Sequence, residues 1–191
     1  LNVDLLGALE GWLPNGQHEP SAIDLTQEAL MGSNQQMLAF LNHLLELIQE
    51  RVMYTQRHVG PAWTAGRTLR ERIGSCRDLA MLMVACCRVA GLPARFVSGY
   101  QLQQPAPEQY DLHAWAEVYL PGAGWRGFDP SAGREVNDRY VVLATSSKPE
   151  LTAAVSGTFS GPPNTDSELS WTINAEEESS ETAPQSLIQA A

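Results

Sequence analysis

The stretch GSCRDLAMLMVACCRVAGLPARFVSGY, residues 74–100, decides the fold, because it reads as one helix followed directly by one strand. From Cys76 to Ala90 the residues are apolar on nearly every side, which predicts a helix buried at the centre of the protein. Gly91 follows at once, and a glycine in this place is a usual stop signal of a helix. The segment ARFVSGYQL (94–102) then has the residue types of a strand.

The segments on either side extend this pattern in two different ways. Upstream, apolar residues recur at helical spacing from about Gln35 to Tyr54, which predicts a second long helix. Downstream, the residue pattern predicts strands over 111–120, 125–130, 139–145 and 169–175. Helices that precede a run of strands are typical of an α+β fold with an antiparallel sheet.

The composition indicates one globular domain with an acidic end. The 191 residues carry a net charge of −10, and no apolar run of the ~20 residues needed to span a membrane is present. All 12 Lys and Arg lie within residues 1–148, and an acidic chain without a basic stripe argues against nucleic acid as a partner. We assign residues 1–175 to a single folded core and 176–191 to an acidic tail or linker that we expect to be disordered. Leu1 in place of Met suggests part of a longer polypeptide.

The three cysteines do not form a disulfide framework. Their number is odd, Cys86 and Cys87 are adjacent, and no C-x-x-C pair occurs. This usage is typical of a reducing, intracellular compartment, so we expect a cytoplasmic protein. Cys86 and Cys87 lie deep in the predicted helix, where burial keeps a thiol inert. We therefore interpret both as core residues, and Cys76 as the candidate for chemistry.

Cys76 stands at the mouth of the helix, and this position favours a nucleophile. The positive end of the helix dipole and the free N–H groups of the first turn both favour thiolate over thiol. The same N–H groups can stabilise the oxyanion that forms when the sulfur attacks a carbonyl. Arg72 and Arg77 add positive charge nearby, and we interpret Asp78 as a structural cap. Taken alone, the position of Cys76 is also compatible with an ordinary buried cysteine.

A thiolate nucleophile needs an imidazole partner, and the chain has four histidines. His113 is the candidate, because it opens an alternating strand and the next strand ends at Asp129. In an antiparallel pair joined by a short turn, two such residues can meet. A simple count across a turn at 122–123 places Asp129 opposite residue 116 or 117, so contact with His113 would require a bulge or a longer offset.

Across residues 74–133, the first stretch and HAWAEVYLPGAGWRGFDPSAG together closely resemble the transglutaminase-like superfamily, in particular its bacterial members often described as cysteine proteases. Four motifs of that family occur in order: G-x-C-x-D, G-[LI]-P-A-R-x-V-S-G-Y, H-A-W-x-E-V and G-W-x-x-x-D-P. The resemblance implies a papain-like α+β fold in which the nucleophile helix packs against an antiparallel sheet. It also implies that Cys76 is the nucleophile, His113 the general base and acid, and Asp129 the group that orients the imidazole.

Four further residues are candidates for the surroundings of this triad. Tyr54 and Trp63 lie upstream of the nucleophile and are candidates for the second oxyanion donor. Trp115 and Glu117 follow His113 on the same face of the predicted strand. We interpret Trp115 as a wall of the site or a core aromatic, and Glu117 as a hydrogen-bonding neighbour of the site or an exposed residue.

The resemblance implies cysteine-dependent acyl transfer on a carboxamide, either a peptide bond or a glutamine side chain, through a thioester acyl-enzyme. Hydrolysis, as in a protease or amidase, is favoured over cross-linking; the substrate is a peptide or protein, and no cofactor or metal is required. Three alternatives stay open: a catalytically silent peptide-binding or structural domain, a thioester-dependent N-acyltransferase, and a zinc site at Cys76, His113 and Asp129. Zinc is disfavoured because structural zinc normally takes four protein ligands and only three are in view.

Overall fold

The computed structural model describes residues 10–12, 18–34, 36–103, 105, 107–155, 157–158, 160–162 and 172–173. Its helices are η1 (Glu10–Trp12), α2 (Pro20–Gly32), α3 (Met37–Arg51), α4 (Ala65–Glu71), α5 (Cys76–Val89) and η2 (Pro149–Thr152). Its strands are β1 (Met53–Tyr54), β2 (Ile73–Gly74), β3 (Ala94–Gln101), β4 (His113–Leu120), β5 (Gly124–Asp129), β6 (Arg134–Glu135) and β7 (Tyr140–Ser146).

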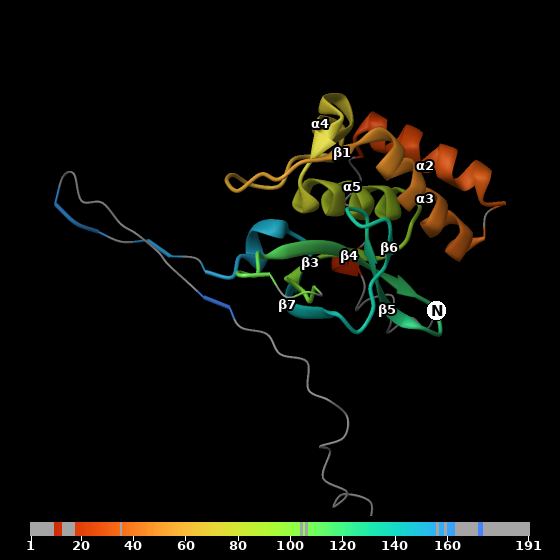
Figure 1. The fold of residues 1–191 in the computed structure, drawn as a ribbon. Coiled ribbons are helices and arrows are strands. Elements are labelled where there is room, and N and C mark those ends of the chain that lie inside the picture. Colours follow the sequence, from red (N-terminus) through yellow and green to blue (C-terminus); the bar gives the residue numbers. More distant parts are fainter. Residues whose placement is uncertain are drawn as a thin grey trace, which may run out of the picture.

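The described part of the protein has two layers, with the α-helices stacked over one face of a sheet (Figure 1). The sheet has five strands in the order β6-β5-β4-β3-β7, and every neighbouring pair is antiparallel. The helix α5 packs on β3 and β4, and α2, α3 and α4 pack on α5 in turn. This arrangement confirms the predicted α+β class, in which the helix that begins at Cys76 lies against an antiparallel sheet.

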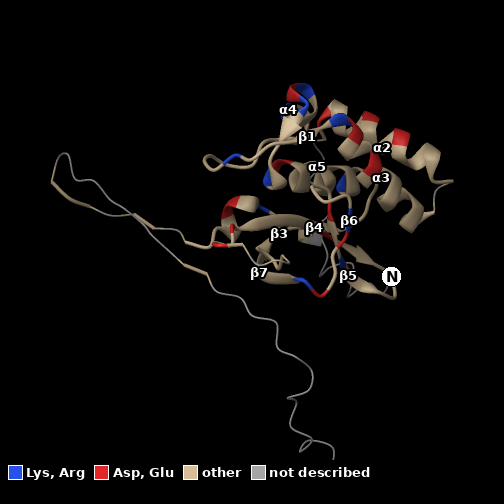
Figure 2. Ribbon diagram, in the orientation of Figure 1, with Lys and Arg blue, Asp and Glu red and all other residues tan. Residues whose placement is uncertain are grey.

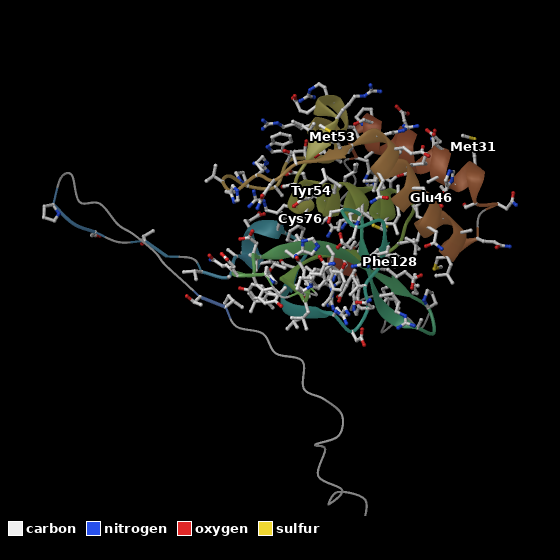
Figure 3. The ribbon with its side chains drawn as sticks, viewed as in Figure 1. Met31, Glu46, Met53, Tyr54, Cys76 and Phe128 are labelled. Atoms are coloured by element: carbon white, nitrogen blue, oxygen red, sulfur yellow. The ribbon has the colours of Figure 1, made fainter. Side chains whose placement is uncertain are left out.

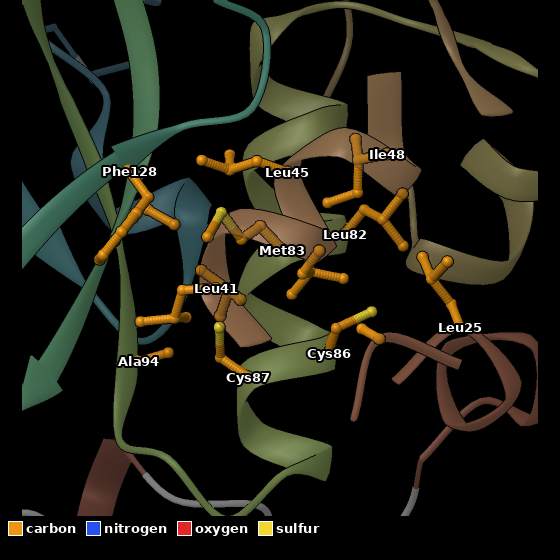
Figure 4. Packing of buried hydrophobic residues seen from close by; sticks show 14 of the residues in the cluster. Leu25, Leu41, Leu45, Ile48, Leu82, Met83, Cys86, Cys87, Ala94 and Phe128 are labelled. Carbon is orange, nitrogen blue, oxygen red and sulfur yellow. The ribbon is translucent and has the colours of Figure 1, made fainter. Parts of the chain in front are cut away.

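The position of α5 between the sheet and the other helices explains why it is apolar on nearly every side. Met83 and Cys87 lie on the side of α5 that faces the sheet, where Phe128 of β5 also lies (Figure 4). Leu82 and Cys86 lie on the side that faces the other helices (Figure 4). All five side chains are at most 1% exposed. Burial raises the pKa of Cys86 to about 12 and the pKa of Cys87 well above its ordinary value, so both thiols stay protonated. Both cysteines are thus core residues, as predicted.

The helix α5 begins at Cys76, as predicted, and ends at Val89, one residue before the predicted end. At its C-terminal end Gly91 adopts a φ of 77°, a left-handed conformation that favours glycine. The N–H of Leu92 then donates to the carbonyl of Cys87 at 2.9 Å and closes the last turn. The chain passes directly into β3, which is the helix-to-strand change that the sequence predicts.

The predicted helix over 35–54 ends earlier than expected. The helix α3 stops at Arg51, because Met53 and Tyr54 leave it to pair in parallel with Ile73 and Gly74. A two-residue parallel pair has no signal in the sequence, since neither segment alternates. The pairing places Tyr54 directly beside the chain that enters α5.

The C-terminal predictions fall almost entirely outside the described residues. Of the predicted strand at 169–175 only residues 172–173 are described, and these two are neither helix nor strand. The predicted tail, 176–191, is not described at all. The division of the chain at residue 175 therefore stays a prediction.

Acidic and basic residues are interspersed along the ribbon of the helical layer in the view of Figure 2, without a continuous basic band. Among the described helices, none combines the length and apolar character that crossing a membrane requires.

Candidate active site

Cys76 is the first residue of α5 and lies where the helix mouth meets the sheet. Its half-buried side chain packs with Met81 against a small cluster of Ala80, Phe96 and Ala114. In the first turn the N–H groups of Asp78 and Leu79 donate to the carbonyl of Ser75, at 2.9 and 3.0 Å, so the N–H groups of Cys76 and Arg77 are the ones without an acceptor in the helix. The side chain of Cys76 thus packs on apolar neighbours at the N-terminus of the helix.

Asp78 holds the start of α5 in place. Its carboxylate accepts hydrogen bonds from the N–H and the hydroxyl of Ser75, each at 2.8 Å, and from the N–H of Trp63 at 2.7 Å. Arg57 forms an ion pair with it, with Nη2 at 2.7 Å from Oδ1. Burial alone would raise the pKa of Asp78, but these donors, Arg57 foremost, lower it, so the carboxylate is charged. The structure therefore gives Asp78 the structural role that the sequence indicates.

His113 is the first residue of β4 and lies between Asp129 and Cys76. Its Nε2 is 2.7 Å from Oδ2 of Asp129, so Nδ1 is the ring nitrogen left to hydrogen-bond the sulfur of Cys76. The side chain of His113 is 16% exposed and that of Asp129 is fully buried. The structure thus brings the sulfur, the imidazole and the carboxylate into one connected chain.

The register of β4 and β5 differs from the simple hairpin count. Ala116 pairs with Phe128 and the pairing continues evenly to the turn, which puts residue 115 opposite Asp129. His113 is therefore a diagonal neighbour of Asp129, and side chains two positions apart on one face can touch. Of the two expected routes to this contact, a bulge or a longer offset, the strands show an offset without a bulge, and the histidine and carboxylate side chains bridge the remaining diagonal.

Two opposing effects act on the imidazole of His113. Burial of the ring lowers its pKa, but hydrogen bonds to Asp129 and Cys76, together with the negative charge of both, outweigh burial and raise the pKa to about 9. The ring is therefore an imidazolium at neutral pH. A protonated imidazole beside the sulfur has a proton that it can give to a leaving group.

Asp129 is saturated with hydrogen-bond donors. Its Oδ1 accepts from the N–H of Ser131 at 2.9 Å, from the hydroxyl of Ser131 at 2.6 Å and from the N–H of Ala132 at 3.2 Å. Its Oδ2 accepts from His113 and from the hydroxyl of Tyr140 at 2.8 Å. Burial would raise the pKa of Asp129, but these donors, led by His113, lower it. The carboxylate is therefore ionised and fixed in one orientation.

Two of these neighbours, Ser131 and Tyr140, were missed by the sequence reasoning. For Ser131 a signal existed, because an Asp followed two residues later by Ser commonly bonds the backbone and hydroxyl of its own turn. Tyr140 had no signal, since it lies beyond β6 and reaches Asp129 only through the order of strands in the sheet.

Tyr54 lies beside the sulfur, at the open side of the site. Figure 3 shows it next to Cys76, and it is 51% exposed. Burial of part of the ring, followed by the negative charges of Cys76, Asp111 and Asp129, raises its pKa, although Arg77 opposes this. The phenol is therefore protonated at neutral pH and has a proton to donate.

The other candidate for the second oxyanion donor is Trp63, and its backbone and its ring both contact other residues. Its backbone N–H is bound to Asp78, and its ring lies between the guanidinium groups of Arg57 and Arg67, at 4.5 and 4.1 Å from the centroid. The amide of Trp63 is thus not free to receive an oxyanion, because the first turn of α5 already uses it.

Trp115 and Glu117 share a face of β4 with His113 but have different neighbours. The ring of Trp115 is fully buried, with its centroid 6.2 Å from that of His113, so it forms a wall beneath the imidazole. Glu117 is paired with Arg95, its partner across β3 and β4, with Nη2 at 2.6 Å from Oε2. The structure does not bring Glu117 to the site, because an opposite charge lies directly across from it.

The two arginines that we expect near the sulfur have different surroundings in the structure. Arg77 stays close, since its charge acts on Tyr54 and its guanidinium donates to the carbonyl of Arg57 at 2.6 Å. Arg72 instead lines a hollow with Asp24 of α2 and Arg51 of α3. It lies at the left-handed end of α4, with a φ of 57°, and the chain turns there before β2.

Within the described ranges, no three His, Cys, Asp or Glu side chains converge as ligands for a metal ion. In Cys76, His113 and Asp129 the imidazole instead contacts both the carboxylate and the sulfur. Such a relay can ionise the sulfur, give a proton to a leaving group and take one from an incoming nucleophile.

Residues 24–130, more than half of the chain, match the family model of the transglutaminase-like superfamily. A relative from Mycobacterium bovis, an uncharacterized protein, is 39% identical over 85 residues, which cover 39% of this chain and 27% of the relative. A protein-glutamine gamma-glutamyltransferase from Pseudomonas aeruginosa is 40% identical over 67 residues, which cover 31% of this chain and 10% of that protein.

Two solved structures resemble the described fold. One is a “putative cysteine protease” from Cytophaga hutchinsonii, with a TM-score of 0.59 and 27% identity over 81% of this chain and 50% of that one. The other is the periplasmic domain of TgpA from Pseudomonas aeruginosa, with a TM-score of 0.54 and 27% identity over 69% of this chain and 49% of that one. This chain thus spans about half of each solved structure and 27% of the mycobacterial relative.

Proposed function

The chain belongs to the transglutaminase-like superfamily, and we propose that within this family it is a cysteine-dependent enzyme that transfers the acyl group of a carboxamide. The substrate we propose is a peptide or protein, attacked at a peptide bond or at a glutamine side chain. The observation that carries the proposal is the unbroken contact from Asp129 through His113 to Cys76.

In the first step the Cys76 thiolate attacks the carbonyl carbon of the carboxamide and a C–S bond forms. The tetrahedral intermediate collapses when the C–N bond breaks. The leaving nitrogen takes the proton of the His113 imidazolium, so the ring becomes neutral and a thioester acyl-enzyme remains. A His113 pKa of about 9 supports this step, since the ring carries the required proton at neutral pH.

The negative charge that develops on the carbonyl oxygen needs donors in place before the reaction. We assign one to the backbone N–H of Cys76 at the mouth of α5, and the second to the hydroxyl of Tyr54. Tyr54 suits this role because its raised pKa keeps the phenol protonated beside the sulfur.

In the second step an acceptor attacks the thioester. Neutral His113 takes a proton from the acceptor, the C–S bond breaks, and the thiolate–imidazolium pair is restored. With water as the acceptor the enzyme is a protease or amidase, and with a primary amine it is a transglutaminase. We propose water, because the structure that resembles this fold over 81% of the chain is named as a cysteine protease.

The proposal is tested by incubating the full-length protein and its Cys76→Ala variant with a peptide library, with and without an added primary amine. We expect cleaved or deamidated peptides with the parent protein and none with the variant. Amine incorporation instead of hydrolysis would identify a transferase. Product from neither protein would favour the silent peptide-binding or structural domain.

Thiol labelling tests the nucleophile without any substrate. At mildly acidic pH, iodoacetamide should modify Cys76 about 100-fold faster than Cys86 or Cys87, which are fully buried. His113→Gln should slow labelling of Cys76 and leave the other two unchanged. Equal rates at all three cysteines would remove the activated thiolate from the mechanism.

The location of the protein stays a proposal. Its three free cysteines favour the cytoplasm, whereas the TgpA domain of similar fold is named as periplasmic. Fractionation of cells that express the full-length protein separates these two compartments.

A further inference from the structure

Tyr140, the first residue of β7, touches the same carboxylate oxygen as the imidazole of the candidate triad. Its hydroxyl donates to Oδ2 of Asp129 at 2.8 Å, and Nε2 of His113 lies 2.7 Å from that oxygen. The side chain reaches this point from the opposite edge of the sheet, across β3 and β4. Tyr140 is 8% exposed, so solvent does not replace this contact.

The neighbours of Tyr140 fix the direction of its proton. The amide nitrogen of Gln101 donates to the hydroxyl at 3.0 Å, and the guanidinium of Arg134 also hydrogen-bonds it. A guanidinium can only donate, so the lone pairs of the hydroxyl serve these two groups and its single proton points to Asp129. Burial and the charge of Asp129 raise the pKa of Tyr140 to about 12, which keeps that proton in place.

Ring packing fixes the position of the phenol as well. The ring of Tyr140 meets that of Trp115 edge to face, with the centroids 5.3 Å apart, and lies 6.1 Å from the ring of His113. Trp115 in turn lies beneath His113, so the three rings form one packed group. A shift of the Tyr140 ring would therefore change the position of the His113 ring.

We propose that Tyr140 is a positioning residue of the candidate site: its hydroxyl, oriented by Arg134, shares Oδ2 of Asp129 with His113 and limits how tightly the carboxylate holds the imidazolium. The reason is electrostatic. A donor aimed at a carboxylate oxygen reduces the negative charge that the oxygen presents to a second donor. The hydroxyl proton also lies close to the imidazolium and repels it. Without the hydroxyl, the proton on His113 is held more strongly.

This proposal rests on the proposed function only where turnover is concerned, because the contact acts on the charge of His113 with or without a substrate. Besides Tyr140, the charged and titratable groups that face the imidazole and its carboxylate are Cys76 from α5, Asp129 from β5, Arg134 from β6 and Tyr54 from β1.

The direct test is an NMR titration of the His113 ring in the full chain. Tyr140→Phe keeps the ring packing and removes the hydroxyl, and we expect it to raise the measured pKa of His113 by about half a pH unit. Arg134→Met should shift it in the same direction by less. Tyr119→Phe is the matched control, since Tyr119 lies on the same sheet but packs on Trp125, and it should leave the titration unchanged. An unchanged or lowered pKa in Tyr140→Phe would overturn the proposal.

The pH profile of turnover separates positioning from packing. If His113 must lose its proton to activate the acceptor, Tyr140→Phe should lower kcat several-fold near neutral pH and move the rising, acidic limb of the profile to higher pH. A tyrosine that served packing alone would leave kcat and the pH profile unchanged in Tyr140→Phe, because the ring is kept. Should Tyr140→Phe fail to fold, the exposed Arg134 provides the same test through Arg134→Met. Absence of turnover would count against the proposed function, and the NMR titration would still decide the role of Tyr140.

Discussion

Asp129 accepts five hydrogen bonds, from the side chains of His113, Ser131 and Tyr140 and from two backbone N–H groups. A carboxylate held in this way cannot turn, so the plane of the His113 ring is fixed with it. The imidazole therefore needs no reorganisation when it gives or takes a proton, which is the advantage of a preorganised site.

Replacing Asp129 with Asn tests this arrangement. The carboxylate charge that raises the pKa of His113 would be lost while burial remains, so the pKa falls from about 9 and a smaller fraction of the ring is imidazolium at neutral pH. We expect turnover to fall by about 100-fold or more. Kinetics over a range of pH, with the exposed Asp138→Asn as control, measure the effect. Full activity in Asp129→Asn would remove the carboxylate from the mechanism.

Replacing Tyr54 with Phe tests the second oxyanion donor. The side chain is 51% exposed, so its hydroxyl contributes little to folding and the melting temperature should hardly change. Loss of one oxyanion donor should lower kcat by about 100-fold. Tyr119→Phe again serves as the control. A Tyr54→Phe variant with parental kcat would leave the stabilisation of the oxyanion to backbone N–H groups alone.

The first turn of α5 and the loop from 55 to 63 form one structural unit through Asp78. The carboxylate binds the N-cap of the helix, the guanidinium of Arg57 and the amide of Trp63 at once. The loop begins directly after Tyr54, so the nucleophile and its proposed oxyanion donor are held by the same buried charge.

Asp78→Asn should break this unit. The change leaves Arg57 without its anionic partner at a largely buried position, and we expect the free energy of unfolding to drop by about 2–4 kcal/mol. Urea unfolding measures the loss. The matched control is Glu71→Gln in the exposed pair with Arg70, at 3.9 Å, which should cost less than about 0.5 kcal/mol. A loss below about 1 kcal/mol in Asp78→Asn would mean that the helix start is held by other contacts.

The helix and strands around the site were predictable because their signals are local. The apolar run of α5, its stop at Gly91 and the alternation of β4 each depend on neighbouring residues only. The pairing of β1 with β2 was not predictable, because two residues carry no period and the partner lies some twenty residues away.

The candidate site shows the same division. Cys76, His113 and Asp129 follow from motifs, whereas the role of Glu117 depended on register. Alternation assigns a residue to a face of the strand but does not say which residue of β3 lies across from it, and here that residue is Arg95. Tyr140 depended on the order of strands, which no local pattern contains.

Across the whole protein, the charge on His113 couples folding to pH. Its pKa is 6.5 ordinarily and about 9 in the folded state, so the folded protein binds the proton more tightly than the unfolded chain. The stability gained from this proton is fully present below pH ~6.5 and is lost as pH rises toward 9, by about 3 kcal/mol.

Urea unfolding of the parent and of His113→Gln at several pH values between 6 and 10 measures this loss. The parent should lose stability more steeply than the variant as pH rises. Both proteins contain the same cysteines and tyrosines, so ionisation of these groups in the unfolded chain cancels in the comparison. Parallel curves would show that His113 binds its proton no more tightly in the folded state.

The placement of Trp115 beneath His113 also allows tryptophan fluorescence to report on the site. A protonated imidazole in contact with an indole quenches its emission far more than a neutral one. With the rings 6.2 Å apart and a pKa of about 9, part of the tryptophan emission should rise in alkaline solution. His113→Gln should abolish that rise while the other four tryptophans respond as before. The fluorescence of Trp115 thus reports whether His113 carries the proton on which the proposed reaction depends.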